Sequence, residues 1–137
     1  MKTYLDSCIL IYRLEGAPEF AGPVAEAIRA AAGVVFCVTD LVRLECLVGP
    51  IRADDADRRA TFEAHFDELT CLALSRGVFE LAAELRARHR LKTPDALHAA
   101  AAITHGCRAA PSHASSSTPV RVRPRATFSL RNACSTL

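Results

Sequence analysis

Short β-prone runs alternate with longer helix-prone runs over the first 107 residues, and this alternation constrains the fold more than any other feature. Apolar runs typical of strands occupy residues 2–5, 34–38 and 71–74. The helices expected after them lie at 7–14, 19–32, 40–48, 54–69, 76–90 and 95–104. Strands separated by helices predict a parallel sheet with helices on both faces, a three-layer α/β/α fold.

Several helix ends are marked by residues with strong positional preferences. Thr39 and Ser75 stand where they can cap the helices that follow them. Gly49-Pro50 is expected to end the helix that starts at Asp40. Thr93 is predicted as the N-cap of the last helix, with Pro94 at its first position.

The composition is that of an ordinary globular domain, with 50% hydrophobic and 23% charged residues. No run approaches the roughly 18 apolar residues of a membrane span, and the N-terminal stretch lacks the pattern of a signal peptide. The six cysteines form no C-x-x-C pair and the five histidines form no H-x-x-x-H pair. The sequence therefore predicts a cytoplasmic protein with mostly buried thiols and no zinc site.

Charge is distributed unevenly along the chain. Residues 108–137 contain five of the 17 basic residues and none of the 15 acids. Residues 1–107 therefore carry a net charge of −3, and residues 108–137 carry a net charge of +5. The last 30 residues also contain three prolines and an SSS run, and the one strand candidate, 120–123, is restricted to an edge by Pro124. We therefore predict a domain over 1–107, followed by a basic C-terminus of disordered composition.

Three acids far apart in the sequence are expected at one edge of the predicted sheet. Asp6 follows the first strand, and Glu45 and Asp95 lie near the starts of later helices. Because ligands collect at the carboxyl ends of parallel strands, the three can share a cleft. Taken singly, each acid is also explained as a helix cap or an exposed charge.

Converging carboxylates would have a defined chemistry. Like charges in one cleft raise each other's pKa unless a cation is bound. Hard cations such as Mg²⁺ or Mn²⁺ prefer oxygen ligands, and a bound ion can activate a water for attack on a phosphodiester. The three acids thus predict metal-dependent hydrolysis that needs no Ser, Cys or His nucleophile.

The chain resembles the PIN domain family, and within it the toxin ribonucleases of VapBC-type toxin–antitoxin pairs. Three segments carry the resemblance, each containing one of the acids. They are residues 4–12 (YLDSCILIY), 39–49 (TDLVRLECLVG) and 92–102 (KTPDALHAAAA). The order and spacing of the segments make the resemblance specific over residues 1–107.

The resemblance implies a PIN-like fold and Mg²⁺- or Mn²⁺-dependent endonucleolytic cleavage of RNA. Asp6, Glu45 and Asp95 would be the catalytic and metal-binding residues, and Ser7 would support the first acid by hydrogen bonding. A small antitoxin and a second copy of the chain would be its protein partners, with no membrane association.

Several basic residues precede the third acid. Arg86, Arg90 and Lys92 are candidates for contacts with RNA phosphates. The same run is explained equally well as solvent-exposed cations at the end of a helix, where positive charge is favourable.

The C-terminus departs from the family pattern, which continues with further strands and a fourth polar site residue. Residues 108–137 contain no acid, and the fourth residue is unassigned. One hypothesis is a frameshift near codon 108, and the other is a genuine basic tail that binds RNA or a partner. A PIN-like module that binds antitoxin or RNA without cleaving is therefore the alternative function. An aspartyl phosphatase is disfavoured, because Cys8 stands where its second acid is required.

Overall fold

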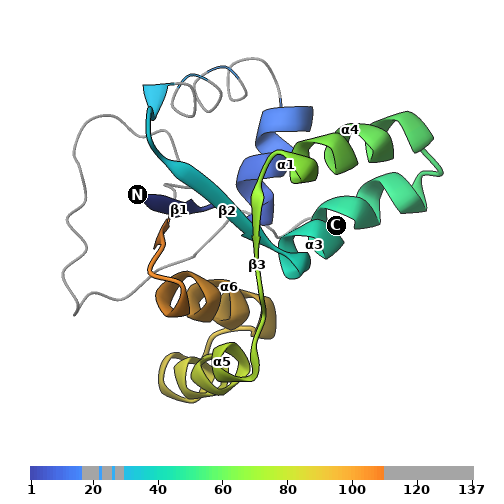
Figure 1. Cartoon of the computed structure of the whole chain (residues 1–137). Coiled ribbons are helices and arrows are strands. Elements are labelled where there is room, and N and C mark those ends of the chain that lie inside the picture. Colours follow the sequence, from blue (N-terminus) through green and yellow to red (C-terminus); the bar gives the residue numbers. More distant parts are fainter. Residues whose placement is uncertain (17–21, 23–25, 27–29, 110–137) are drawn as a thin grey trace.

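The computed structural model describes residues 1–16, 22, 26 and 30–109 (Figure 1). Its sheet is parallel throughout, with the strand order β3-β2-β1-β4. The strands are β1 (Lys2–Tyr4), β2 (Val35–Thr39), β3 (Thr70–Leu72) and β4 (Arg108–Ala109). The helices are α1 (Ser7–Glu15), α3 (Asp40–Arg52), α4 (Ala56–Asp67), α5 (Arg76–His89) and α6 (Thr93–Thr104).

The helices cover both faces of the sheet. Figure 1 shows α5 and α6 on one side and α1, α3 and α4 on the other. The predicted three-layer α/β/α fold with a parallel sheet is therefore confirmed. The helix expected over 19–32 lies largely outside the described residues, as does the strand candidate at 120–123.

Strand β4 was not predicted. Arg108 and Ala109 pair in parallel with Thr3 and Tyr4 of β1. A two-residue strand is too short to show an apolar pattern in the sequence, and only its pairing identifies it. β4 makes β1 an interior strand, with neighbours on both sides.

The predicted end of α3 is wrong. The helix continues through Gly49-Pro50 to Arg52, and Pro50 is buried within it. A proline inside a helix removes one backbone hydrogen bond. Here the last turn is still closed, because Ala53 N donates to Gly49 O (3.1 Å) and Asp55 N donates to Pro50 O (3.0 Å).

The residues predicted as helix caps lie at the helix starts, but their side chains do not cap the helices. Thr39 and Ser75 precede α3 and α5 as predicted, but neither side chain makes a capping hydrogen bond. Lys92, and not Thr93, precedes α6, so Thr93 is the first helical residue and Pro94 lies in the first turn. Proline is compatible with that turn, since the N–H it lacks has no helical partner there.

The core forms where the helices meet the sheet. It contains Tyr4 and Leu5 from the N-terminal segment and Cys37 and Val38 from β2. The helices contribute a larger apolar set: Ile9, Leu10, Val42, Cys46, Leu47, Phe62, Phe66, Val78, Ala82, Ala96, Leu97, Ala100, Ala101 and Ala102. The thiols of Cys37 and Cys46 are buried as expected, whereas Cys71 is exposed. Among the helices that are described, none combines the length and apolarity needed to cross a membrane.

Replacing Phe62 by alanine should destabilise the fold by about 3–5 kcal/mol, because its ring is 1% exposed and its removal leaves a cavity beside Phe66. Phe79→Ala is the matched control, since that ring is 52% exposed and should lose less than about 1 kcal/mol. Urea unfolding followed by circular dichroism measures both. Equal losses in the two variants would contradict the packing described here.

Candidate active site

Asp6 lies at the junction of β1 and α1. It is the N-cap of α1, and its Oδ1 accepts a hydrogen bond from the backbone N–H of Ile9 at 3.0 Å. The explanation of this acid as a helix cap is therefore correct for one of its oxygens. The position at the carboxyl end of an interior strand is the one expected for a site residue.

Glu45 lies in the middle of α3, and its carboxylate is held by a histidine outside the set of predicted site residues. Glu45 Oε2 is 2.9 Å from Nε2 of His98, which belongs to α6. Burial by itself raises the pKa of this carboxyl group. The hydrogen bonds from His98 and Ser7, with the charge of His98, outweigh burial and lower the pKa. Ser7, which was predicted to support the first acid, thus forms a hydrogen bond with Glu45.

The expectation of a raised pKa is therefore wrong for Glu45. That expectation treated the acids as facing one another, where like charges would oppose ionisation. In the structure the nearest polar partners of Glu45 are hydrogen-bond donors. Donors stabilise the ionised form, so the carboxylate stays charged.

His98 is itself held from the opposite side of its ring. Its Nδ1 is 2.8 Å from the hydroxyl of Tyr4, which is 2.9 Å from Thr39 Oγ1. Tyr4 and Thr39 are 3% and 1% exposed, and burial raises the pKa of Tyr4 far above its usual range. Thr39, predicted as a helix cap, thus uses its hydroxyl in a chain of hydrogen bonds that reaches Glu45.

Asp95 is half-buried in the first turn of α6. It precedes His98 by three residues, and residues at this spacing lie on the same face of a helix. The side of α6 that carries the third acid therefore also carries the histidine that binds the second. This spacing, visible in TPDALH, is the sequence pattern that would have identified His98.

The site supplies carboxylates that could bind a metal ion, but the described side chains do not form a ready group of three ligands. The carboxylate oxygens are suitable ligands for Mg²⁺ or Mn²⁺. Among the residues that the structure describes, however, no group of three or more His, Cys, Asp and Glu side chains is placed to hold an ion. One oxygen of Glu45 is already bound to His98.

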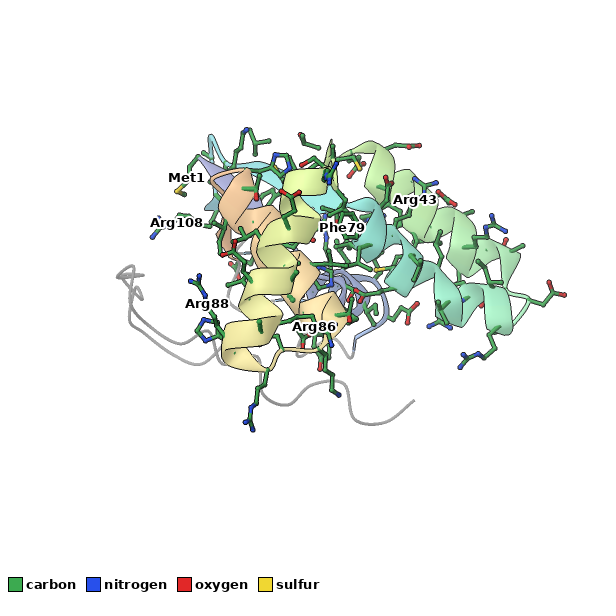
Figure 2. All side chains as sticks on the ribbon, turned by 90° about the horizontal axis from the view of Figure 1, so that it is seen from below. Met1, Arg43, Phe79, Arg86, Arg88 and Arg108 are labelled. Atoms are coloured by element: carbon green, nitrogen blue, oxygen red, sulfur yellow. The ribbon has the colours of Figure 1, made fainter. Side chains whose placement is uncertain are left out.

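The predicted RNA-binding cations gather at the junction of α5 and α6. The Arg86 guanidinium donates from Nε to the Leu91 carbonyl at 3.1 Å, so it also fastens this junction. Arg90 ends α5 in the left-handed conformation, and Lys92 directly precedes α6 with its side chain exposed. Figure 2 shows Arg86 and Arg88 toward the C-terminal end of α5, whereas Phe79 lies toward its beginning.

Comparison with known proteins decides the family. The model of the PIN domain matches residues 3–113. The chain belongs to the PIN domain family. No curated protein matches its sequence.

Two solved structures have a similar fold. A toxin–antitoxin complex from Klebsiella pneumoniae superposes with a TM-score of 0.64 at 21% identity, covering 80% of this chain and 83% of the other. VapBC2 from Rickettsia felis, bound to a DNA fragment from its promoter, gives a TM-score of 0.67 at 17% identity, covering 80% of this chain and 85% of the other. At these identities the similarity establishes the fold.

The stability of the metal-free PIN domain should depend on the ionisation of Glu45. Because its folded pKa is lowered from the usual 4.5, its contribution is present above that value and is lost as the pH falls through the folded pKa. Glu45→Gln should therefore flatten the loss of stability as the pH falls below about 4.5. Urea unfolding across this range measures the slope, and Glu68→Gln, at the exposed end of α4, is the control that should keep it.

Proposed function

We propose that this PIN domain protein is an endoribonuclease, the toxin of a toxin–antitoxin pair, which hydrolyses RNA phosphodiester bonds. PIN domains are generally nucleases, which supports the choice of reaction. The observation that carries the proposal is the arrangement of Asp6, Glu45 and Asp95. They follow β1, β2 and the α5–α6 junction, within the segments that resemble the family.

The three acids would have different tasks in this reaction. Asp6 is fixed by the Ile9 N–H, and Glu45 is kept ionised by His98 and Ser7. An ionised carboxylate can orient an attacking water by accepting a hydrogen bond from it, and we propose this task for Glu45. Asp95 lies on the face of α6 that carries His98, and we propose it as the third catalytic acid.

We propose Mg²⁺ or Mn²⁺ as the cofactor and the same three acids as its ligands. PIN nucleases typically use divalent metals, and carboxylate oxygens are the ligands that these ions prefer. The described side chains form no ready group of three ligands. The metal requirement therefore rests on the chemistry of the family, and depletion of metal tests it.

The proposed partners are RNA, an antitoxin protein and a second copy of the chain. The similar solved structures include toxin–antitoxin complexes, which supports the antitoxin. We place the protein in the cytoplasm, where its RNA substrate would be found.

A second candidate is a PIN domain that binds antitoxin or RNA without cleaving. Two observations favour it. The described residues contain no three-ligand group, and residues 108–137, where the family has its fourth site residue, contain no acid. RNA cleavage by the purified protein distinguishes the two candidates.

Purified protein incubated with structured RNA and Mn²⁺ should produce fragments, and Asp6→Asn should slow cleavage by about 100-fold or more, because it removes the charge of one catalytic acid. Asp67→Asn, at the exposed end of α4, is the matched control and should keep full activity. EDTA should abolish the product. Cleavage that persists in Asp6→Asn or in EDTA would contradict the proposal, and failure of the wild type to cleave would favour the binding module.

RNA binding should become less dependent on salt when cations at the α5–α6 junction are removed. In an Asp6→Asn background, Arg90→Ala and Lys92→Ala should each reduce the slope of log affinity against log salt by about 0.7, the value for one phosphate contact on a single strand. Arg76→Ala, at the other end of α5, is the control. Fluorescence anisotropy at several salt concentrations gives the slopes. Unchanged slopes in all three variants would show that these cations face solvent at the helix end and do not contact RNA.

A further inference from the structure

The contact between Glu45 and His98 joins two helices on opposite sides of the sheet. The residues are 53 positions apart in the sequence, and their side chains are 24% and 10% exposed. α3 and α6 thus meet through this pair at the carboxyl edge of the sheet. A glutamate in mid-helix has many rotamers in solution, so a fixed partner restricts where its carboxylate lies.

The directions of the hydrogen bonds follow from the chemistry of the groups. The ionised Glu45 can only accept, so Nε2 of His98 carries a proton and donates it to Oε2. When the ring is neutral, Nδ1 accepts from the Tyr4 hydroxyl, and when the ring is charged, Nδ1 donates to the Tyr4 oxygen. In both states Nε2 donates to Glu45.

The contacts continue to the end of β2, where the Tyr4 hydroxyl lies 2.9 Å from that of Thr39 and either oxygen can donate. Thr39, Tyr4, His98 and Glu45 thus form one chain of hydrogen bonds. The buried hydroxyl of Tyr4 holds the ring on the side of Nδ1, and Nε2 faces the acid.

A histidine that only fills the core would satisfy its nitrogens within the core. His98 instead directs Nε2 outward to a partly exposed carboxylate and Nδ1 inward to a buried hydroxyl. Its ring also lies against that of Tyr4, with centroids 5.9 Å apart. The inner contacts orient the ring, and the outer contact acts on the acid.

We propose that His98 is a positioning residue: the chain Thr39–Tyr4–His98 holds the carboxylate of Glu45 in one orientation at the active site, through the proton on Nε2. The role of Glu45 in cleavage rests on the function proposed above. The restraint on its side chain does not, because it exists in the protein without RNA or metal.

Two substitutions of similar character separate the Nε2 contact from the packing of the ring. In His98→Gln the side-chain amide reaches about as far as Nε2 and can still donate to Glu45. In His98→Asn the amide reaches only the region of Nδ1, so Tyr4 keeps a partner and Glu45 loses the donor on α6 while keeping Ser7. Both variants replace the ring by a primary amide, so a difference between them reports the contact with Glu45.

The first measurement uses the full chain without metal. Three-bond couplings of the Glu45 side chain, measured by NMR, should indicate a single χ1 rotamer in the wild type and in His98→Gln, and averaged rotamers in His98→Asn. A single rotamer in all three proteins would overturn the proposal. Averaging in both variants would overturn it as well, provided that their thermal unfolding shows both to be folded.

The second measurement is RNA cleavage in Mn²⁺. His98→Asn should lower kcat by about 10- to 100-fold with little change in KM, and His98→Gln should restore most of kcat. A faster His98→Asn enzyme would overturn the proposal, since it would show that His98 withholds Glu45 from the reaction. A wild type that does not cleave, with NMR results as expected, would reject the nuclease function and leave the positioning role standing.

Discussion

The interior position of β1 is the constraint on which the rest of the structure depends. Only three residues long, β1 pairs in parallel with β2 on one side and β4 on the other. Its register aligns Tyr4 with Cys37, and the N–H of Leu5 extends the ladder to the Cys37 carbonyl at 2.9 Å. Carried two residues further, the same offset places Asp6 level with Thr39. The strand ends therefore bring the first acid and the start of the hydrogen-bond chain to one edge.

The small side chains of α6 allow that edge to become a connected site. Ala96, Ala100 and Ala101 are fully buried, so the helix lies close to its neighbours without bulky groups between them. From this position the ring of His98 contacts Tyr4 beneath it and Glu45 across the edge. A larger residue in place of the alanines would move the histidine away from both partners. The close packing of these alanines thus determines where the side chain of His98 lies.

The sequence predicted the parts of this arrangement that depend on nearby residues. Asp6 directly follows a short strand, and the helix around Asp95 was recognised from its proline and alanines. The pKa of Glu45 could not be predicted, because it depends on burial and on hydrogen bonds from Ser7 and from His98, 53 residues away. The helix through Gly49-Pro50 and the strand at Arg108–Ala109 depend likewise on tertiary contacts that local preferences do not contain.

An ionised Glu45 also affects how RNA would approach the site. Residues 1–107 carry a net charge of −3, and the hydrogen bonds from His98 and Ser7 keep the Glu45 carboxylate ionised at the sheet edge. An RNA phosphate is repelled by such a site unless cations lie close by, since screening weakens charges farther than about 10 Å at 0.1 M salt. Lys92 directly precedes α6 and stands three residues before Asp95. Under the proposed function, the cations at the α5–α6 junction would therefore attract the RNA phosphates that the Glu45 carboxylate repels.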